Sequence, residues 1–117
     1  MIRLGASILS WIPQWSSEAG NYAIQKAASL GFDLLEIPLP AHLKLDGPAL
    51  RAATRKAGLE LSFSLILPKE AHMPFYPHKA LLHLKKAIDF VEKAGGQFLG
   101  GVLYSARCFY REAHGGK

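Results

Sequence analysis

The sequence of 117 residues contains one cysteine, Cys108, and lacks any long hydrophobic run. A single cysteine excludes an intrachain disulfide and a redox or zinc motif built from paired cysteines, so Cys108 is interpreted as an inert thiol. A membrane helix needs about 20 mostly apolar residues, whereas the longest apolar stretches, 34–39 and 61–67, are short and interrupted. The first residues also lack the apolar stretch and cleavage site of a signal peptide. We therefore predict a cytoplasmic protein with no membrane partner.

The formal net charge of +5 is not gathered into a stripe along the sequence. A nucleic-acid surface usually interleaves Lys and Arg with aromatic side chains, and no such stretch occurs. The basic residues instead occupy outer positions of predicted helices; they are Arg51, Arg55, Lys56, Lys79, Lys85, Lys86 and Lys93. We predict solvated helix faces and no nucleic-acid partner.

Short apolar runs alternate with amphipathic segments along the whole sequence. Apolar residues three and four positions apart indicate one buried face of a helix. In the longest predicted helix this face comprises Leu81, Leu84, Ile88 and Val91. The predicted strands are 2–9, 33–39, 59–67 and 98–104. The predicted helices are about 18–30, 46–57 and 78–94.

Each predicted helix ends at a glycine that leads directly into the next strand. Gly31, Gly58 and Gly95 stand at these ends, where glycine is common because it takes a positive φ without steric cost. This alternation with short connections predicts an α/β fold with parallel strands covered by helices. Periodicity leaves open whether the sheet is a barrel or doubly wound. The segment 5–8, Gly-Ala-Ser-Ile, matches neither glycine-rich nucleotide motif, which disfavours a dinucleotide-binding protein.

Four segments, in consecutive order, resemble a group of sugar enzymes. Residues 30–37, Leu-Gly-Phe-Asp-Leu-Leu-Glu-Ile, resemble the second-strand signature of the sugar phosphate isomerase/epimerase superfamily, the xylose isomerase-like TIM barrels. Residues 100–105, Gly-Gly-Val-Leu-Tyr-Ser, resemble the fourth strand of the ketose 3-epimerases, which act on D-tagatose and D-psicose. Trp11 and Trp15 keep the spacing of the two tryptophans that follow the first strand in these epimerases, and 57–62 is similar to their entry into the third strand.

The resemblance implies a partial (β/α)8 TIM barrel of about four βα units with parallel strands, forming one domain over residues 1–117. The family is more than twice this length. It binds a divalent metal (Mn, Co or Mg) through two glutamates, an aspartate and a histidine on strands five to eight. We therefore interpret the chain as a truncated amino-terminal half that holds neither catalytic residues nor metal ligands. Whether the short chain is natural or frameshifted stays open.

In that family the metal polarises the substrate oxygens while the glutamates move a proton beside a carbonyl. The resemblance implies that this chain contributes part of the pocket wall for a small-molecule sugar and is inactive alone. Two alternatives stay open: a cofactor-free isomerase or lyase that uses Glu36, and a non-catalytic α/β module that binds a sugar or a partner chain. The sequence does not identify the sugar or the metal.

The resemblance also implies which residues contact the sugar, because the catalytic face of a barrel lies at the carboxyl ends of its strands. Tryptophans would cover the apolar face of the sugar, a glutamate would hydrogen-bond within the pocket, and residues after the fourth strand would lie at its mouth. The candidate substrate-binding residues are Trp11, Trp15, Glu36, Tyr104, Ser105 and Arg107.

Some positions depart from the epimerase pattern. Ser7 and Arg107 stand where an aromatic residue is common, and Leu65 and Leu67 stand where small residues are common. The bulkier third strand and the added guanidinium together put the ketose preference in doubt. The guanidinium of Arg107 suits a carboxylate or phosphate group. Structural roles also stay open: the two tryptophans as a packed loop, and Glu36 as a buried carboxylate paired across strands.

The five histidines lack the spacing of a metal site and are interpreted as surface or capping residues; they are His42, His72, His78, His83 and His114. A half barrel would leave the backbone groups of its edge strands unpaired, which favours association. We therefore expect a homo-oligomer or a poorly soluble monomer.

Overall fold

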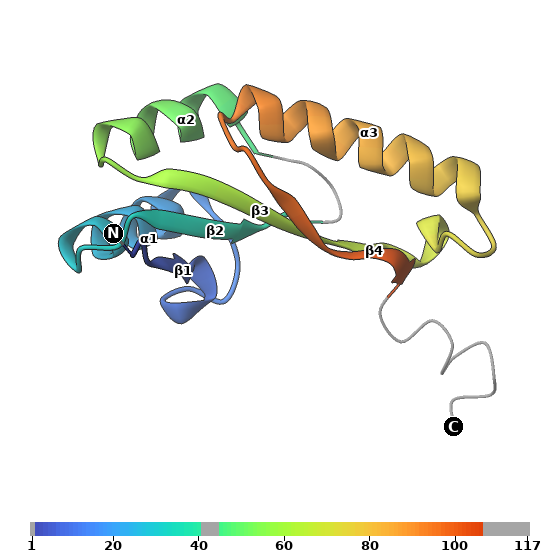
Figure 1. Ribbon diagram of the computed structural model, residues 1–117, viewed down its shortest axis with the longest axis horizontal. Helices are drawn as coiled ribbons and strands as arrows, with labels where there is room; N and C mark the ends of the chain where they lie inside the picture. The colour runs from blue at the N-terminus through green and yellow to red at the C-terminus, as the bar shows by residue number, and fades with distance from the viewer. Residues whose placement is uncertain (1, 41–44, 107–117) are drawn as a thin grey trace.

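The computed structural model describes residues 2–40 and 45–106. Within these residues four strands form one parallel sheet in the order β1-β2-β3-β4 (Figure 1). The strands are β1 Gly5–Ser7, β2 Leu34–Pro38, β3 Glu60–Leu67 and β4 Leu99–Ala106. The helices are α1 Ser17–Ser29, α2 Gly47–Lys56 and α3 Pro77–Lys93, with 3₁₀ turns η1 Ile8–Ser10 and η2 Lys69–Ala71. This topology confirms the predicted α/β fold with parallel strands.

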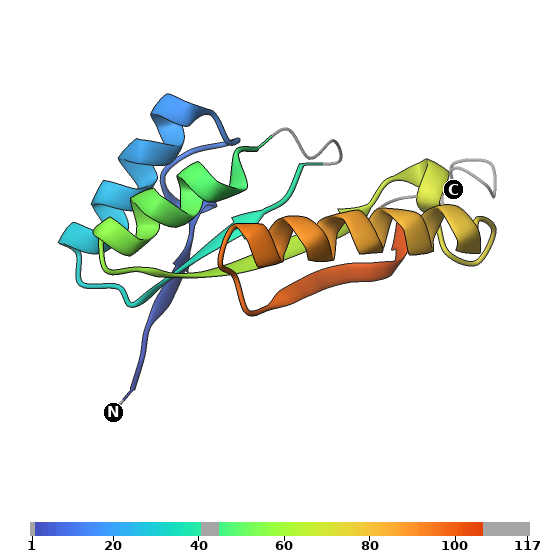
Figure 2. The same ribbon diagram turned by 90° about the horizontal axis from the view of Figure 1, so that it is seen from above.

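The helices cover one face of the sheet and leave the other face open (Figures 1 and 2). β3 shows the division, because successive side chains of a strand point to opposite faces. Leu61, Phe63, Leu65 and Leu67 are buried beneath the helices, whereas the alternate residues of β3 are half-buried or exposed. The hydrophobic core therefore lies between the sheet and the helices.

Side-chain caps and glycines set the helix boundaries. The hydroxyl of Ser16 accepts the N–H of Ala19 at 3.1 Å, and the carboxylate of Asp46 accepts the N–H of Ala49 at 3.0 Å. Such caps satisfy backbone donors that a first helical turn leaves unpaired. At the other ends, the predicted positive-φ glycines are confirmed, with φ of 83°, 75° and 78° at Gly31, Gly58 and Gly95.

The first predicted strand was too long. β1 covers only Gly5–Ser7, and the chain then turns into η1. The Ser7 hydroxyl accepts the N–H of Leu9 at 3.3 Å, so this side chain ends the strand by capping the turn. Ile8 is fully buried although it lies outside β1. The apolar run in the sequence therefore continues past the strand, which is why it predicted a strand that was too long.

The predicted buried face of α3 was also wrong in part. Leu81 and Ile88 are 51% and 55% exposed, whereas Ala80, Ala87 and Val91 are buried. Alanines at the contact allow the helix to lie close to the sheet, and the longer side chains then flank the contact. None of the helices within 2–40 and 45–106 combines the length and apolar character that a membrane crossing requires.

Candidate functional site

Polar side chains form a row on the open face of the sheet. Ser7 of β1 pairs in register with Glu36 of β2, and Glu36 pairs with Ser62 of β3. Their neighbours in sequence, such as Leu35 and Leu61, are buried on the helix side. The row therefore lies on the face that the helices do not cover, on three adjacent strands.

A hydrogen bond holds the carboxylate of Glu36 in this row. The hydroxyl of Ser64, the next residue of β3 on the same face, donates to Oε1 of Glu36 at 2.5 Å. Both side chains are half-buried. A carboxylate in a restrained orientation can accept hydrogen bonds from the hydroxyl groups of a ligand, and serine hydroxyls both donate and accept.

The two serines of β3 were missed as site residues, although a signal for them existed. In Leu61-Ser62-Phe63-Ser64-Leu65 the polar and apolar residues alternate strictly, which places both serines on the face opposite the core. The expectation that Leu65 and Leu67 add bulk to β3 at the pocket was wrong for the same reason. Leu65 and Leu67 are 1% exposed, beneath the helices, on the face opposite Glu36 and the serines.

Trp15 lies at the carboxyl ends of the first two strands. Its ring packs over Gly20 of α1 so closely that a methyl group at Gly20 would lie 2.4 Å from the ring. Trp15 also lines an open cavity of about 570 Å³, together with Pro38, Leu39 and Asp46. Pro38 follows Glu36 by two residues on the same face of β2, so the cavity adjoins the polar row.

Trp11 has a different environment from Trp15. Its ring contacts Phe32 edge to face, with 6.0 Å between centroids and 68° between planes. Phe32 precedes β2, so this contact lies toward the amino end of that strand, whereas Trp15 lines a cavity at the carboxyl end. The two tryptophans therefore have different contacts, and a sugar contact by Trp11 stays a prediction.

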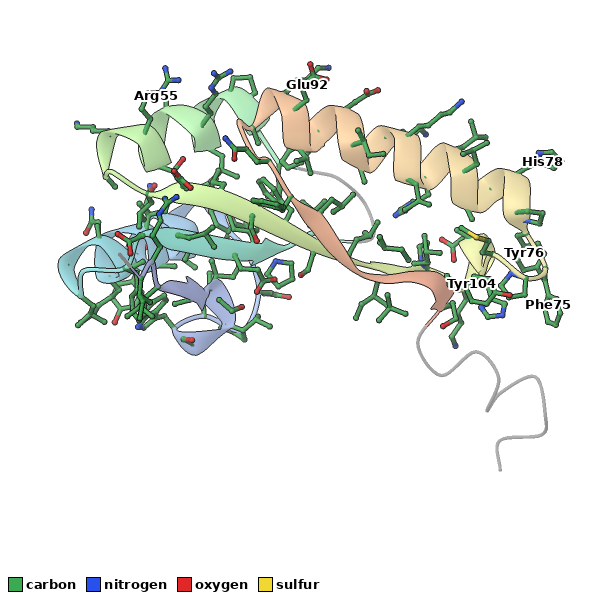
Figure 3. All side chains as sticks on the ribbon, viewed as in Figure 1. Arg55, Phe75, Tyr76, His78, Glu92 and Tyr104 are labelled. Carbon is green, nitrogen blue, oxygen red and sulfur yellow. The ribbon has the colours of Figure 1, made fainter. Side chains whose placement is uncertain are left out.

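The end of β4 is irregular at the residues predicted to form the pocket mouth. Ile66 pairs with Val102 but the next residue, Leu67, pairs with Ala106. Leu103, Tyr104 and Ser105 therefore form a bulge between two paired positions. Bulges beside active sites commonly redirect side chains, and Tyr104 is 61% exposed at this end of the sheet (Figure 3).

Gly101 makes the close approach of β4 to β3 possible. Its φ is 115°, a conformation that side chains disfavour. A methyl group at Gly101 would lie 2.2 Å from the carbonyl oxygen of Leu65. The Gly-Gly pair, noted in the sequence only as a family resemblance, thus has a steric reason at its second residue.

His72 is not the surface or capping residue that its sequence context predicted. Its side chain is fully buried, and Nδ1 accepts the N–H of Ala106 at 3.0 Å. The following residue, Met73, donates its N–H to the carbonyl of Tyr104 at 3.0 Å. The loop between β3 and α3 therefore continues the pairing with β4 beyond the end of β3.

A metal site is not formed by the described residues. Across 2–40 and 45–106, no three His, Cys, Asp or Glu side chains lie close enough together to hold an ion. The polar row contributes one carboxylate, Glu36, which does not fit a metal that needs several charged ligands. Four residues interpreted above, His42, Arg107, Cys108 and His114, lie outside the described residues.

The parallel sheet, its helix-covered face and the polar row on its open face define an α/β protein with the architecture of a partial TIM barrel. No family profile matches the chain. Structures of D-allulose 3-epimerase from Methylomonas sp., one in complex with D-allulose, superpose with a TM-score of 0.81 at 30% and 29% identity. The match covers 90% of this chain and 38% of theirs.

Two curated proteins are similar in sequence. The chain is 30% identical over 115 residues to a ketose 3-epimerase of Arthrobacter globiformis, covering 95% of this chain and 40% of that protein. It is 29% identical over 109 residues to an L-ribulose 3-epimerase of Methylomonas sp. (strain DH-1), covering 90% of this chain and 38% of that protein. The chain is thus similar to ketose 3-epimerases over their amino-terminal part, and it spans about two fifths of the length of these curated relatives.

Proposed function

We propose that this chain forms the sugar-binding wall of a ketose 3-epimerase-like site. The observation that carries the proposal is the hydrogen bond of Ser64 to Glu36 within a polar row on the open sheet face. The homologue that binds D-allulose supports a ketose as the ligand. A sugar presents several hydroxyl groups to such a row and an apolar C–H face to an aromatic ring.

The division of roles follows from the positions of the side chains. Glu36 accepts hydrogen bonds from the sugar, and the serines beside it add donors and acceptors. Trp15, already restrained by its contact with Gly20, lies in the cavity beside this row and covers the apolar face of the sugar. Tyr104 and Ser105 line the mouth at the end of β4.

The chemical step needs more than these residues. Moving a proton beside a carbonyl requires a base and an electrophile that stabilises the developing charge. The described residues bring together one carboxylate and no metal-ligand cluster. We infer that the metal expected from the resemblance, Mn, Co or Mg, needs ligands from further βα units, and that residues 1–117 bind the sugar without converting it.

The edges of the sheet favour association. β1 and β4 each have a strand neighbour on one side within the described residues. Ile66 of β3 pairs in register with Val102 of β4 on the open face, and each residue is more than two fifths exposed. An exposed strand edge beside apolar side chains promotes pairing with another chain. We propose that the protein associates through this edge, as a homo-oligomer.

Titration calorimetry with D-allulose tests the proposed function. Wild-type protein should bind, and Glu36→Gln should weaken binding about tenfold, about 1.4 kcal/mol, because it removes the charge of the acceptor. Ser64→Ala should weaken binding less, because it removes the hydrogen bond that orients the Glu36 carboxylate but leaves the carboxylate itself in place. Glu92→Gln makes the same change on the exposed surface of α3 (Figure 3) and should leave binding unchanged.

Two outcomes contradict the proposal. If the wild-type protein does not bind D-allulose at millimolar concentration, the site is not a ketose site. If Glu36→Gln and Glu92→Gln bind equally well, the polar row is not where the sugar lies. Turnover by residues 1–117 with added manganese would contradict the inference that they bind without catalysis, whereas binding without turnover is the behaviour of a binding module.

A further inference from the structure

The β3–α3 loop holds the end of β4 through two hydrogen bonds on either side of Ser105. Met73 N–H donates to the carbonyl of Tyr104, and Nδ1 of His72 accepts the N–H of Ala106, each at 3.0 Å. The first bond uses backbone atoms that any residue supplies. The second uses a side chain, so it depends on the identity of residue 72.

His72 is suited to this contact by its burial. Both His72 and the Ala106 backbone to which it bonds lie in the protein interior, at 0% and 4% residue exposure. A buried N–H needs an acceptor, because water cannot replace it. The His72 and Phe75 rings also contact each other edge to face, with centroids 5.4 Å apart, which restrains the orientation of the imidazole.

The bond lies where the bulge of β4 closes. Pairing with β3 is lost after Val102 and resumes at Ala106. The positions of the three residues between, Leu103–Ser105, therefore depend on the contacts that fix β4 at Val102 and at Ala106. Gly101 permits the approach at the first end, and His72 holds the second.

We propose that His72 is a positioning residue: by accepting the Ala106 N–H it sets the shape of the β4 bulge and so places Tyr104 and Ser105 at the mouth of the sugar site. This inference rests on the proposed function. His72 itself does not contact the sugar, since its side chain is buried behind the bulge. Figure 3 shows Tyr104 at the same end of the sheet as Phe75 and Tyr76, the residues that follow His72 in the loop.

Two polar substitutions of similar size test the inference. In His72→Asn the side-chain oxygen can occupy the position of Nδ1, whereas in His72→Gln the amide reaches toward the position of Nε2. Amide hydrogen exchange by NMR reports the Ala106 bond directly, and calorimetry with D-allulose reports the site. Phe90→Leu, which disturbs the contact of Phe90 with Phe63 near the start of β4, is the control for general destabilisation.

We expect exchange at Ala106 about tenfold faster in His72→Gln than in His72→Asn, with D-allulose affinity about fivefold weaker in the Gln variant. The Asn variant should retain wild-type affinity within about twofold. Faster exchange with unchanged affinity in His72→Gln would overturn the positioning role and leave the proposed function intact. Equal loss of affinity in Phe90→Leu, or in His72→Asn, would overturn it too. Absence of D-allulose binding in the wild-type protein would overturn both.

Discussion

The two sides of the carboxyl edge of the sheet are built differently. On the β2–β3 side, pairing runs without interruption from Leu34 with Glu60 to Pro38 with Ser64. On the β3–β4 side it breaks after Ile66, and the strand continues through a bulge. A regular ladder positions side chains through backbone bonds that tolerate many substitutions. A bulged strand depends on particular residues, here Gly101 and His72, so the second side should be the more sensitive to mutation.

The largest effect is expected at Gly101, which tests the bulged side. Gly101→Ala should destabilise the fold by about 3 kcal/mol, because it adds a methyl group against the Leu65 carbonyl in a conformation that disfavours side chains. Urea unfolding measures the change. Gly100→Ala is the matched control: no atom lies within 4 Å of the added methyl group, and the change should be about 0.5 kcal/mol or less. Equal effects at the two glycines would contradict the described approach of β4.

A smaller effect is expected at Gly20 of α1, which lies outside the bulged side and packs against Trp15. Gly20→Ala places a methyl group 2.4 Å from the Trp15 ring, so the ring must move. Overpacking costs about 1–3 kcal/mol, partly offset by the roughly 1 kcal/mol that alanine gains over glycine in a helix. Tryptophan fluorescence and urea unfolding should both change.

The double variant Gly20→Ala/Trp15→Leu separates the clash from other effects. Removing the ring should make the added methyl group neutral or stabilising, so the two substitutions should be clearly non-additive. Additive effects would mean that Trp15 does not pack on Gly20. D-Allulose affinity should fall in Gly20→Ala if Trp15 covers the sugar.

The smallest effect is expected at the amino edge, which serves as a reference for both sides. Arg3 and Glu60 form an ion pair at 2.7 Å, but both are more than half exposed. Glu60→Gln should change the urea midpoint only slightly, and the difference should disappear at high salt, because solvent and ions screen exposed charges. If Glu60→Gln destabilised the fold as much as Gly101→Ala, the amino edge of the sheet would be no less sensitive to mutation than the carboxyl edge.

The pH dependence of the contribution of Arg3 is also predictable. The hydrogen bond from Arg3 to Glu60, followed by the charge of that carboxylate, raises the pKa of Arg3 above its ordinary value. Because the pKa of Arg3 is higher in the folded protein than in the unfolded chain, the protonated guanidinium stabilises the folded state. The contribution of Arg3 is therefore present at every pH below the ordinary arginine pKa and is lost only in strong alkali. Unfolding midpoints across neutral pH should show no transition from Arg3.

Much of the fold could be predicted because its signals are local. The glycines after each helix, the alternation in β3 and the order of strands and helices all depend on neighbouring residues. Glu36 could also be singled out as a candidate from the sequence, since a carboxylate near a strand end stands out among apolar residues. The alternation in β3 indicates which face Ser64 occupies, but not its bond to Glu36, because 28 positions separate the two residues and their contact depends on the register of β2 with β3.

The sequence by itself determined the alternating elements, their approximate boundaries and the resemblance to ketose 3-epimerases, because periodicity and short motifs are properties of adjacent residues. Only the tertiary structure decided which face of α3 is buried, that Trp11 and Trp15 have separate neighbours, and that His72 holds the end of β4. These features arise from contacts between distant segments. Their geometry depends on how closely two backbones approach, as at Gly101 and Leu65, and no local pattern encodes that distance.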